Sequence, residues 1–203
     1  MYDKLLLATI NPHKTREYRS LLEGIPYDLV TLADVGINHV ASEVGQTMEE
    51  NARIKAADYS ARSGLLTMAD DSGLEVNALG GAPGVYSARF AGEGATDSDR
   101  IKLLLERLAG VPWEKRAARF RCVICLSEPG GEVCTCPGEC RGLITFEPRG
   151  SEGFGYDPVF FFPELGKTMA ELPMDVKNRV SHRGQAARLA RQALEKLKGS
   201  RGG

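Results

Sequence analysis

Residues 65–73 read Leu65-Leu66-Thr67-Met68-Ala69-Asp70-Asp71-Ser72-Gly73, a short apolar run followed by two adjacent acids, a hydroxyl and a glycine. The apolar run predicts a buried strand. Because an unpaired carboxylate is costly inside a protein, we expect the strand to end at Asp70 and Asp71, which would then face a cation, a water molecule or a substrate. The end of a strand is a common place for an active site in α/β proteins. On these residues alone, a functional site and a simple Asp-Ser-Gly turn are equally good interpretations.

The composition is typical of one globular domain. The chain has 203 residues, of which 42% are hydrophobic and 26% are charged, which is enough for a core and for a single domain over 1–203 with two lobes. The apolar runs are too short to cross a membrane and the N-terminus lacks a signal-peptide layout, so we expect a cytoplasmic protein with no membrane partner. A net charge of −1 argues against binding to nucleic-acid polymers but allows a small anionic ligand.

Strand and helix signals alternate along the first half of the chain. Each predicted helix begins at a capping residue, and each of the three ends at a glycine. Expected strands cover residues 4–9, 27–32 and 65–69, and expected helices cover 12–23, 47–63 and 96–109.

Hairpin signals dominate the second half until a last amphipathic helix. Expected extended segments cover 118–126, 133–136, 142–146 and 159–162, with a turn at 128–131. The last helix would carry its apolar side chains at Ala186, Leu189, Ala190, Ala193, Leu194 and Leu197, and the Gly-rich tail 199–203 is expected to be flexible. This order predicts an α/β fold with a mixed central sheet flanked by helices.

The first candidate site lies where the first strand gives way to a helix. Thr9, Asn11 and Lys14 would add a hydroxyl, an amide and a full positive charge to the free N–H groups of the helix start. Such a set suits a phosphate chain. An ordinary N-cap with a solvated lysine is the alternative interpretation.

The second candidate site is acidic. Glu43, Asp70 and Asp71 offer hard oxygen ligands from separate segments, which suit Mg²⁺, and a spare carboxylate could deprotonate a water. A surface loop acid is the alternative for Glu43.

Two further motifs lie downstream. Phe154-Gly155-Tyr156-Asp157 combines aromatic rings with a carboxylate, the groups needed to stack a nucleobase and accept its N–H groups, although aromatic residues beside a strand are more often core. His182 and Arg183 would crowd the first turn of the last helix, where cations oppose the helix dipole, so a ligand there would supply the missing negative charge. A plain surface pair is the alternative.

Five cysteines lie between Cys122 and Cys140. Cys122-x-x-Cys125 followed by Cys134-x-Cys136 resembles a zinc-site pattern, but the alternation of 119–126 would send Cys122 and Cys125 to opposite faces of a strand. We therefore favour half-buried thiols in a β-hairpin over a metal site.

Taken together, the motifs resemble the inosine triphosphate pyrophosphatase family, the Ham1-like noncanonical purine nucleoside triphosphate pyrophosphatases. The segments that carry the resemblance run from the first strand to the last helix. They are residues 8–14, 49–56, 69–74, 78–84, 154–158 and 181–184.

This resemblance implies Mg²⁺-dependent hydrolysis of purine nucleoside triphosphates such as ITP, dITP and XTP to the monophosphate and pyrophosphate. It also implies a homodimer and a two-lobed fold with the active site in the cleft. Two alternatives stay open: a noncatalytic nucleotide-binding or sensing module, and a Maf-like pyrophosphatase for other modified nucleotides.

The resemblance also assigns roles by position. Thr9, Asn11 and Lys14 would hold the triphosphate. Glu43 and Asp71 would bind Mg²⁺, with Asp71 also acting as the base. Ser72 and Lys55 would contact the substrate, and the base pocket would be formed by Phe154, Gly155, Tyr156, Asp157, Lys177, His182 and Arg183. The role of Asp70 stays open.

Overall fold

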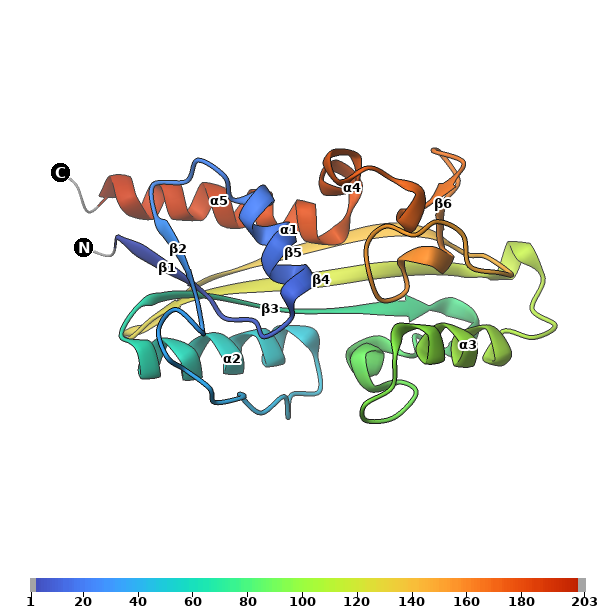
Figure 1. Cartoon of the computed structure of the whole chain (residues 1–203), viewed down its shortest axis with the longest axis horizontal. Coiled ribbons are helices and arrows are strands. Elements are labelled where there is room, and N and C mark those ends of the chain that lie inside the picture. Colours follow the sequence, from blue (N-terminus) through green and yellow to red (C-terminus); the bar gives the residue numbers. More distant parts are fainter. Residues whose placement is uncertain (1–2, 201–203) are drawn as a thin grey trace. The chain divides into compact units, whose positions relative to one another are not determined.

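The computed structural model of the chain describes residues 3–200 (Figure 1). Among these residues the strands form a mixed sheet in the order β2-β1-β3-β4-β5-β6-β7. β1 pairs in parallel with β2 and β3, whereas β6 pairs antiparallel with β5 and β7. The strands are β1 (Lys4–Leu7), β2 (Asp28–Thr31), β3 (Leu66–Val76), β4 (Ala117–Glu128), β5 (Gly131–Ile144), β6 (Phe160–Phe162) and β7 (Lys167–Thr168). The predicted α/β fold with a mixed sheet is confirmed.

The helices that the sequence predicts begin at their capping residues, whereas α4 (Met174–Val180) was not predicted and has no side-chain cap. At the start of α2, Thr47 Oγ1 accepts a hydrogen bond from the Glu50 amide and the Glu50 carboxylate accepts one from the Thr47 amide, which forms a capping box. Gly64 ends α2 with a φ of +69°, a conformation that glycine adopts without strain. The helices are α1 (Pro12–Leu21), α2 (Met48–Ser63), α3 (Asp97–Arg107), α4 (Met174–Val180) and α5 (His182–Ser200).

The described chain forms two compact units, each with its own core. The first unit comprises residues 3–71, 122–138 and 183–200, and the second comprises 72–121 and 139–182. β3, β4 and β5 each pass from one unit into the other. That 1–203 acts as a single domain with its site in a cleft stays a prediction.

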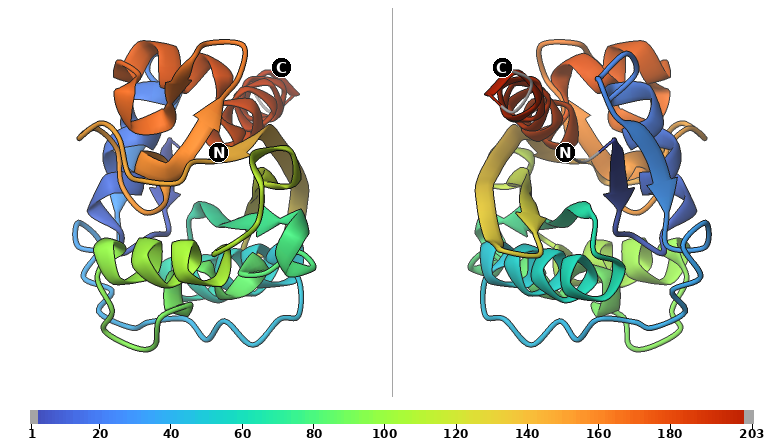
Figure 2. Two further views of the ribbon diagram at one scale, coloured as in Figure 1. Left: turned by 90° about the vertical axis from the view of Figure 1, so that its right-hand side faces the viewer. Right: turned by 90° about the vertical axis from the view of Figure 1, so that its left-hand side faces the viewer.

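The core of the first unit joins α1 and α5 to the strands. Figures 1 and 2 show these two helices over one face of the strands of this unit and α2 over the other face. The small side chains of α5 allow it to approach the strands closely. The buried residues include Leu5, Leu7, Tyr18, Leu22, Leu66, Met68, Ala186, Ala190 and Leu194.

The core of the second unit is built around α3 and the later strands. Ile101, Leu104 and Leu108 recur at helical spacing and are buried. They belong to one apolar cluster with aromatic side chains from β4, β6 and the segment before β6, namely Phe120, Tyr156, Phe160 and Phe162.

Three expectations from the sequence are wrong. β5 is one strand through Pro137-Gly138, although the sequence predicts two segments there, because the strand continues as the chain passes into the second unit. Leu189 is exposed, since the buried face of α5 is centred on Ala186, Ala190 and Leu194 and leaves Leu189 on its flank. α5 also extends through Ser200, so only 201–203 of the predicted tail lie outside the described residues.

Between residues 3 and 200, no helix is long and apolar enough to cross a membrane.

Candidate active site

β3 does not end at its acids, contrary to the expectation from the sequence. The strand runs on from Leu66 to Val76, and the side chains of Asp70 and Asp71 lie in its interior with exposed fractions of 3% and 7%. Adjacent residues of a strand point to opposite faces, so the two carboxylates meet different helices. Each has partners there that offset the cost of its burial, which is why the strand can continue.

Asp70 faces α1. Its Oδ2 atom accepts a hydrogen bond from Lys14 Nζ at 2.8 Å and lies 3.9 Å from the Cys122 thiol sulfur. Burial alone would raise the pKa of this carboxyl, but the charges of Lys14 and Lys55 outweigh it and bring the pKa below its ordinary value. Asp70 is therefore an ionised partner that holds Lys14 in place.

Asp71 faces α2. Asn51 Nδ2 donates to Asp71 Oδ2 at 3.1 Å, and Lys55 Nζ lies 3.6 Å from Asp71 Oδ1. Burial raises the pKa of Asp71 above its ordinary value, and the nearby lysines offset this effect only in part. Asp71 is thus a carboxylate with increased proton affinity.

Lys55 joins Asp71 to Glu43. Its Nζ donates to Glu43 Oε1 at 2.7 Å, so the two carboxylates predicted to bind a metal converge on the same ammonium group. Burial disfavours the charged form of Lys55, but the surrounding acids outweigh burial and raise its pKa. The structure therefore brings Glu43, Lys55 and Asp71 together.

Asn51 was given no role by the sequence motifs, yet it is fully buried in this cluster. Its side-chain oxygen accepts a hydrogen bond from the Gly45 amide at 2.8 Å while its nitrogen binds Asp71. A Cβ atom at Gly45 would lie 2.7–2.8 Å from Glu50 and Asn51, so only glycine lets the loop approach α2 this closely. Asn51 lies four residues before Lys55, on the helix face toward β3. This i, i+4 spacing is the sequence signal that could have identified Asn51 as a site residue.

The start of α1 forms a complete N-cap. Asn11 Oδ1 accepts hydrogen bonds from the amides of His13 at 2.9 Å and Lys14 at 3.3 Å, and Thr9 Oγ1 accepts one from the Asn11 amide at 3.2 Å. The side chains of Thr9 and Asn11 thus order the turn that presents Lys14. Their predicted contact with phosphate stays a prediction.

Arg183 lies in the first unit, at the start of α5. Its guanidinium donates to Glu17 Oε2 at 2.7 Å, and both side chains are almost fully buried. Glu17, on α1, was not predicted as part of the site. A buried acid on a helix cannot be told from an exposed one in the sequence, because acids are mostly exposed.

In the second unit, Asp157 organises the Phe154–Asp157 loop. Its Oδ2 atom accepts hydrogen bonds from the Phe154 amide at 2.9 Å and from Lys177 Nζ at 2.6 Å. Lys177 Nζ also lies 5.1 Å from the centre of the Phe154 ring, a cation–π distance. A Cβ atom at Gly153, where φ is +77°, would lie 2.1 Å from Asp157 Oδ2, so the loop requires glycine there.

The rest of this loop is anchored to its own unit. The Gly155 amide donates to Asp97 Oδ2 at 2.6 Å, and the Tyr156 hydroxyl donates to the Ser87 carbonyl at 2.9 Å. Tyr156 is a core side chain, as the alternative interpretation of the sequence expected, and burial raises its pKa. Phe154 is the half-buried aromatic side chain of the loop.

His182 is also buried. Its ring stacks on Phe120 with centroids 4.6 Å apart and planes 12° apart, and Nδ1 lies 3.9 Å from the Cys140 sulfur. His182 and Arg183 are therefore not a surface pair. Ser72, which follows the two acids on β3, is half-buried.

Cys122 and Cys125 point to opposite faces of β4, as predicted. Cys122 contacts Tyr18 and Asp70, whereas the Cys125 sulfur lies 4.0 Å from Glu132. All five cysteines lie in the described part of the chain, and none of them forms a disulfide there. In the described part of the chain, no three His, Cys, Asp or Glu side chains are grouped to hold a metal by themselves.

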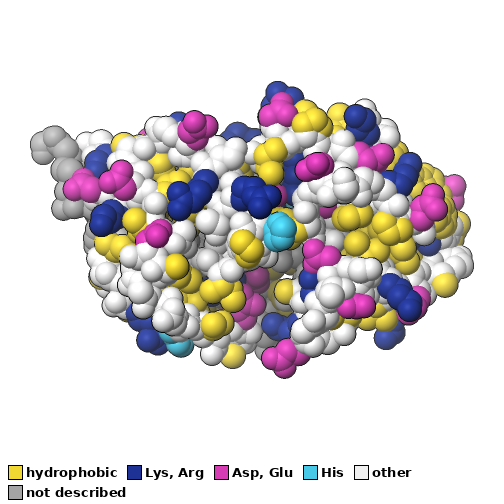
Figure 3. Space-filling view, viewed as in Figure 1, with side chains coloured by type: hydrophobic (Ala, Val, Ile, Leu, Met, Phe, Trp, Pro, Cys, Tyr) yellow, Lys and Arg dark blue, Asp and Glu magenta, His cyan; other side chains and the backbone are white. Residues whose placement is uncertain are grey.

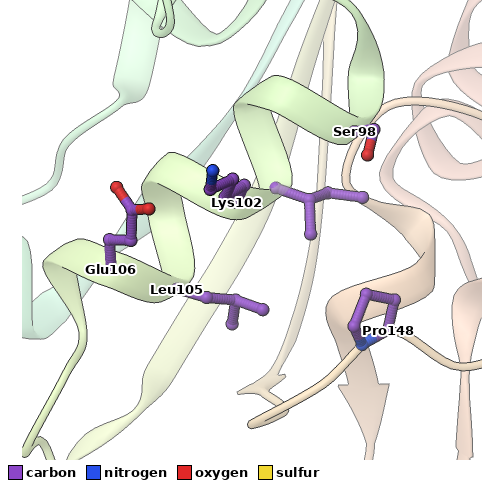
Figure 4. Close-up of a pocket in the computed structure, with 6 residues that line it drawn as sticks. Ser98, Lys102, Leu105, Glu106 and Pro148 are labelled. Carbon is purple, nitrogen blue, oxygen red and sulfur yellow. The ribbon is translucent and has the colours of Figure 1, made fainter.

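A separate hollow lies beside α3 (Figure 4) and has a volume of about 460 Å³. Its lining residues are Ser98, Ile101, Lys102, Leu105, Glu106 and Pro148, none of which was predicted to be functional. On the face drawn in Figure 3, basic and acidic side chains are interspersed, and hydrophobic side chains gather toward the right of the view.

The sequence and the fold both have known relatives. The model of the Ham1 family matches residues 5–193. The dITP/XTP pyrophosphatase of Geobacter sulfurreducens is 50% identical over 191 residues, which is 94% of this chain and 96% of the relative. The protein of the same name from Bacillus subtilis is 46% identical over 190 residues, with the same coverage.

Solved structures of Ham1 proteins are also similar to this chain. A HAM1 protein from Coxiella burnetii superposes with a TM-score of 0.87 at 40% identity, covering 97% of this chain and all of that one. The Ham1 protein from Staphylococcus aureus has a TM-score of 0.85 at 37% identity, with coverages of 96% and 99%.

Proposed function

The chain belongs to the Ham1 family, and on that premise we propose that it hydrolyses ITP, dITP and XTP to the nucleoside monophosphate and pyrophosphate. The chain is then a nucleoside triphosphate pyrophosphatase that removes deaminated purine nucleotides from the nucleotide pool. The observation that carries the proposal is the convergence of Glu43 and Asp71 on Lys55, next to the ion pair of Lys14 with Asp70. A binding module would not need a buried carboxylate of raised proton affinity.

Asp71 is proposed to accept the proton of the attacking water. A general base must be ionised at working pH and still have appreciable proton affinity. Burial raises the pKa of Asp71, and the Lys55 charge keeps the carboxylate ionised. Asn51 fixes the orientation of the carboxylate through its hydrogen bond to Oδ2, so that Oδ1 faces Lys55.

Lys14 and Lys55 are proposed to bind the triphosphate, together with Thr9, Asn11 and Ser72. A triphosphate carries about four negative charges, which two buried or half-buried lysines and the free N–H groups of a helix start can partly neutralise. Asp70 acts through Lys14, because its carboxylate holds the ammonium group at 2.8 Å.

Glu43 and Asp71 are proposed to hold Mg²⁺. Two carboxylates that converge on one ammonium group provide hard oxygen ligands in a place that favours a cation, and Mg²⁺ usually takes only one or two such ligands besides waters and phosphates. When bound, the ion would neutralise developing charge on the phosphoryl oxygens.

Base selection is proposed to rest on Phe154, Gly155, Asp157, Lys177 and His182, with Tyr156 supporting the loop and Arg183 adding a donor. The Lys177 ammonium donates hydrogen bonds and accepts none, and Asp157 fixes its position. It would favour the oxo group of hypoxanthine or xanthine over the amino group of adenine. Each unsatisfied contact costs roughly 1–3 kcal/mol, so several contacts would give selectivity of about 10².

We also propose that the chain acts in the cytoplasm, and that it forms a homodimer, as the family resemblance implies. Light scattering at micromolar concentration would test the mass, and cell fractionation would test the location.

The activity is tested by pyrophosphate release with Mg²⁺ from ITP, dITP, XTP, GTP, ATP and dUTP at equal concentration. We expect the first three to be hydrolysed about 10²-fold more efficiently than ATP. Binding of ITP without pyrophosphate release would instead indicate a sensing module. A preference for dUTP would indicate a pyrophosphatase for other modified nucleotides.

A further inference from the structure

Cys134 and Cys136 form a close pair of free thiols on β5, within the first unit. Their sulfur atoms are 3.8 Å apart. Cys134 is half-buried, whereas Cys136 is 3% exposed. We call these two side chains the thiol pair, and no residue in the pair belongs to the site described above.

The pairing follows from strand geometry. Residues two apart on a strand project from the same face, so their side chains are neighbours. Their Cα atoms are about 6.6–6.8 Å apart in an extended strand. This separation lies at the upper end of the Cα range of about 4.4–6.8 Å for a disulfide, and the parallel Cβ atoms are farther apart than the roughly 3.5–4.5 Å that a disulfide needs, so the strand must bend locally for the bond to close.

We propose that the thiol pair is an oxidation site at which a hydroperoxide converts Cys134 and Cys136 into a reversible disulfide. The Cys134 thiolate attacks the terminal peroxide oxygen, the O–O bond breaks, and the leaving alkoxide, or hydroxide in the case of hydrogen peroxide, takes up a proton to give an alcohol or water and a Cys134 sulfenic acid. The Cys136 sulfur then loses its proton and attacks the Cys134 sulfur, the S–O bond breaks, and hydroxide leaves as water. The two sulfurs are oxidised by two electrons in total, and the peroxide is reduced.

Cys134 is the first thiol to react because it is both reachable and activated. The hydrogen bond from the Cys136 thiol lowers the pKa of Cys134 to about 7, and the same bond raises the pKa of Cys136. Burial raises the pKa of Cys122 and of Cys125 to about 12. The neighbouring thiols of the hairpin are therefore protonated and shielded, and the reaction is confined to the pair.

The disulfide is expected to be easily reduced. Closing a bond between residues two apart on a strand places the Cα separation at the limit of the allowed range, and strain makes a disulfide more reducible. Glutathione at millimolar concentration should restore both thiols.

The full-length reduced protein is treated with one equivalent of hydrogen peroxide, alkylated, and digested with trypsin and a Glu-specific protease. The peptide of residues 133–139 then contains Cys134 and Cys136 as its only cysteines, and the peptide of residues 122–132 contains Cys122 and Cys125 as an internal control. We expect the first peptide to lose two hydrogen atoms and resist alkylation, and to regain both thiols with glutathione. The second peptide should be fully alkylated.

Three variants separate the steps. In Cys136→Ser, the Cys134 sulfenic acid should accumulate and react with dimedone. In Cys134→Ser, loss of the Cys136 thiol should slow at least about tenfold. Cys125→Ser, a matched change of a buried thiol in the same hairpin, should leave the oxidation of the pair unchanged.

The proposal is overturned if Cys134 proceeds to sulfinic acid without a disulfide, if it pairs with another cysteine, or if Cys122 and Cys125 react as fast as the pair. A disulfide that resists glutathione would overturn its reversibility. The outcome is independent of whether the chain hydrolyses ITP.

Discussion

Lys14 on α1 and Asp70 on β3 form an ion pair with Nζ 2.8 Å from Oδ2, across 56 positions of the sequence. The next residue, Asp71, points to the opposite face of β3 and meets Asn51 and Lys55 on α2. Two adjacent acids therefore have different partners and different proton affinities. This difference predicts that their variants behave differently.

Asp71→Asn should abolish most of the activity without loss of the fold. The amide cannot accept a proton, so we expect kcat for ITP to fall by about 10² or more, while binding of ITP persists. Steady-state kinetics with a binding titration and circular dichroism would measure both effects. Unchanged Mg²⁺-dependent turnover would remove Asp71 from the role of base.

Asp70→Asn should disturb the position of Lys14 and leave the hydrolysis step itself largely intact. With the anchoring charge lost, Lys14 is less well positioned for phosphate, so we expect KM for ITP to rise by about tenfold, with a smaller change in kcat. A loss in kcat as large as that of Asp71→Asn would contradict a positioning role. The charge-conserving variant Asp70→Glu should have a KM for ITP between those of the wild type and Asp70→Asn.

The ion pair of Lys14 with Asp70 also predicts that the free energy of unfolding depends on pH. The folded-state pKa of Asp70 lies below its ordinary value of 3.8, so its ionised form stabilises the fold above that value, and this contribution is lost as pH falls further through the folded-state pKa. The difference in unfolding free energy between wild type and Asp70→Asn should therefore be largest near neutral pH and shrink below pH 3.8. Urea unfolding at several pH values would measure it. A difference that does not change with pH would contradict the assignment.

Gly153→Ala should damage the Phe154–Asp157 loop. The added Cβ would lie 2.1 Å from Asp157 Oδ2 and 3.0 Å from Lys177 Nζ, and φ is +77°. We expect KM for ITP to rise and selectivity over ATP to fall. Gly166→Ala is the matched control, because its φ of +64° brings similar backbone strain with no atom within 4 Å. Equal effects of the two changes on KM would exclude a specific role for the close contact between Gly153 and the Asp157 carboxylate.

Glu43→Gln should weaken the response to Mg²⁺. Loss of one of the two carboxylates on Lys55 removes a hard anionic ligand, so the Mg²⁺ concentration for half-maximal activity should rise by about tenfold. Glu49→Gln, at the exposed start of α2, should leave that concentration unchanged. The same Mg²⁺ dependence in both variants would exclude Glu43 as a ligand.

The helices and the hairpin could be predicted because their signals are local. The capping box between Thr47 and Glu50 and the Gly-rich turn at 128–131 each lie within a few residues of the structure they specify. Tyr156 shows the limit of such signals. Its ring lies in the core and its hydroxyl donates to the Ser87 carbonyl 69 positions away, a partner that its motif does not indicate, and its predicted contact with a base stays a prediction.

The sequence by itself determined the strand–helix alternation of the first half, the mixed α/β class and the family, because periodicity, capping and motif spacing are properties of neighbouring residues. Only the tertiary structure decided that β3 continues through its acids and that Asp70 and Asp71 differ. The cost of burying each carboxylate is offset by partners from other elements, Lys14 for one acid and Asn51 with Lys55 for the other. Long-range pairing of this kind leaves no local signal, so the roles of two neighbouring acids become distinct only when the chain folds.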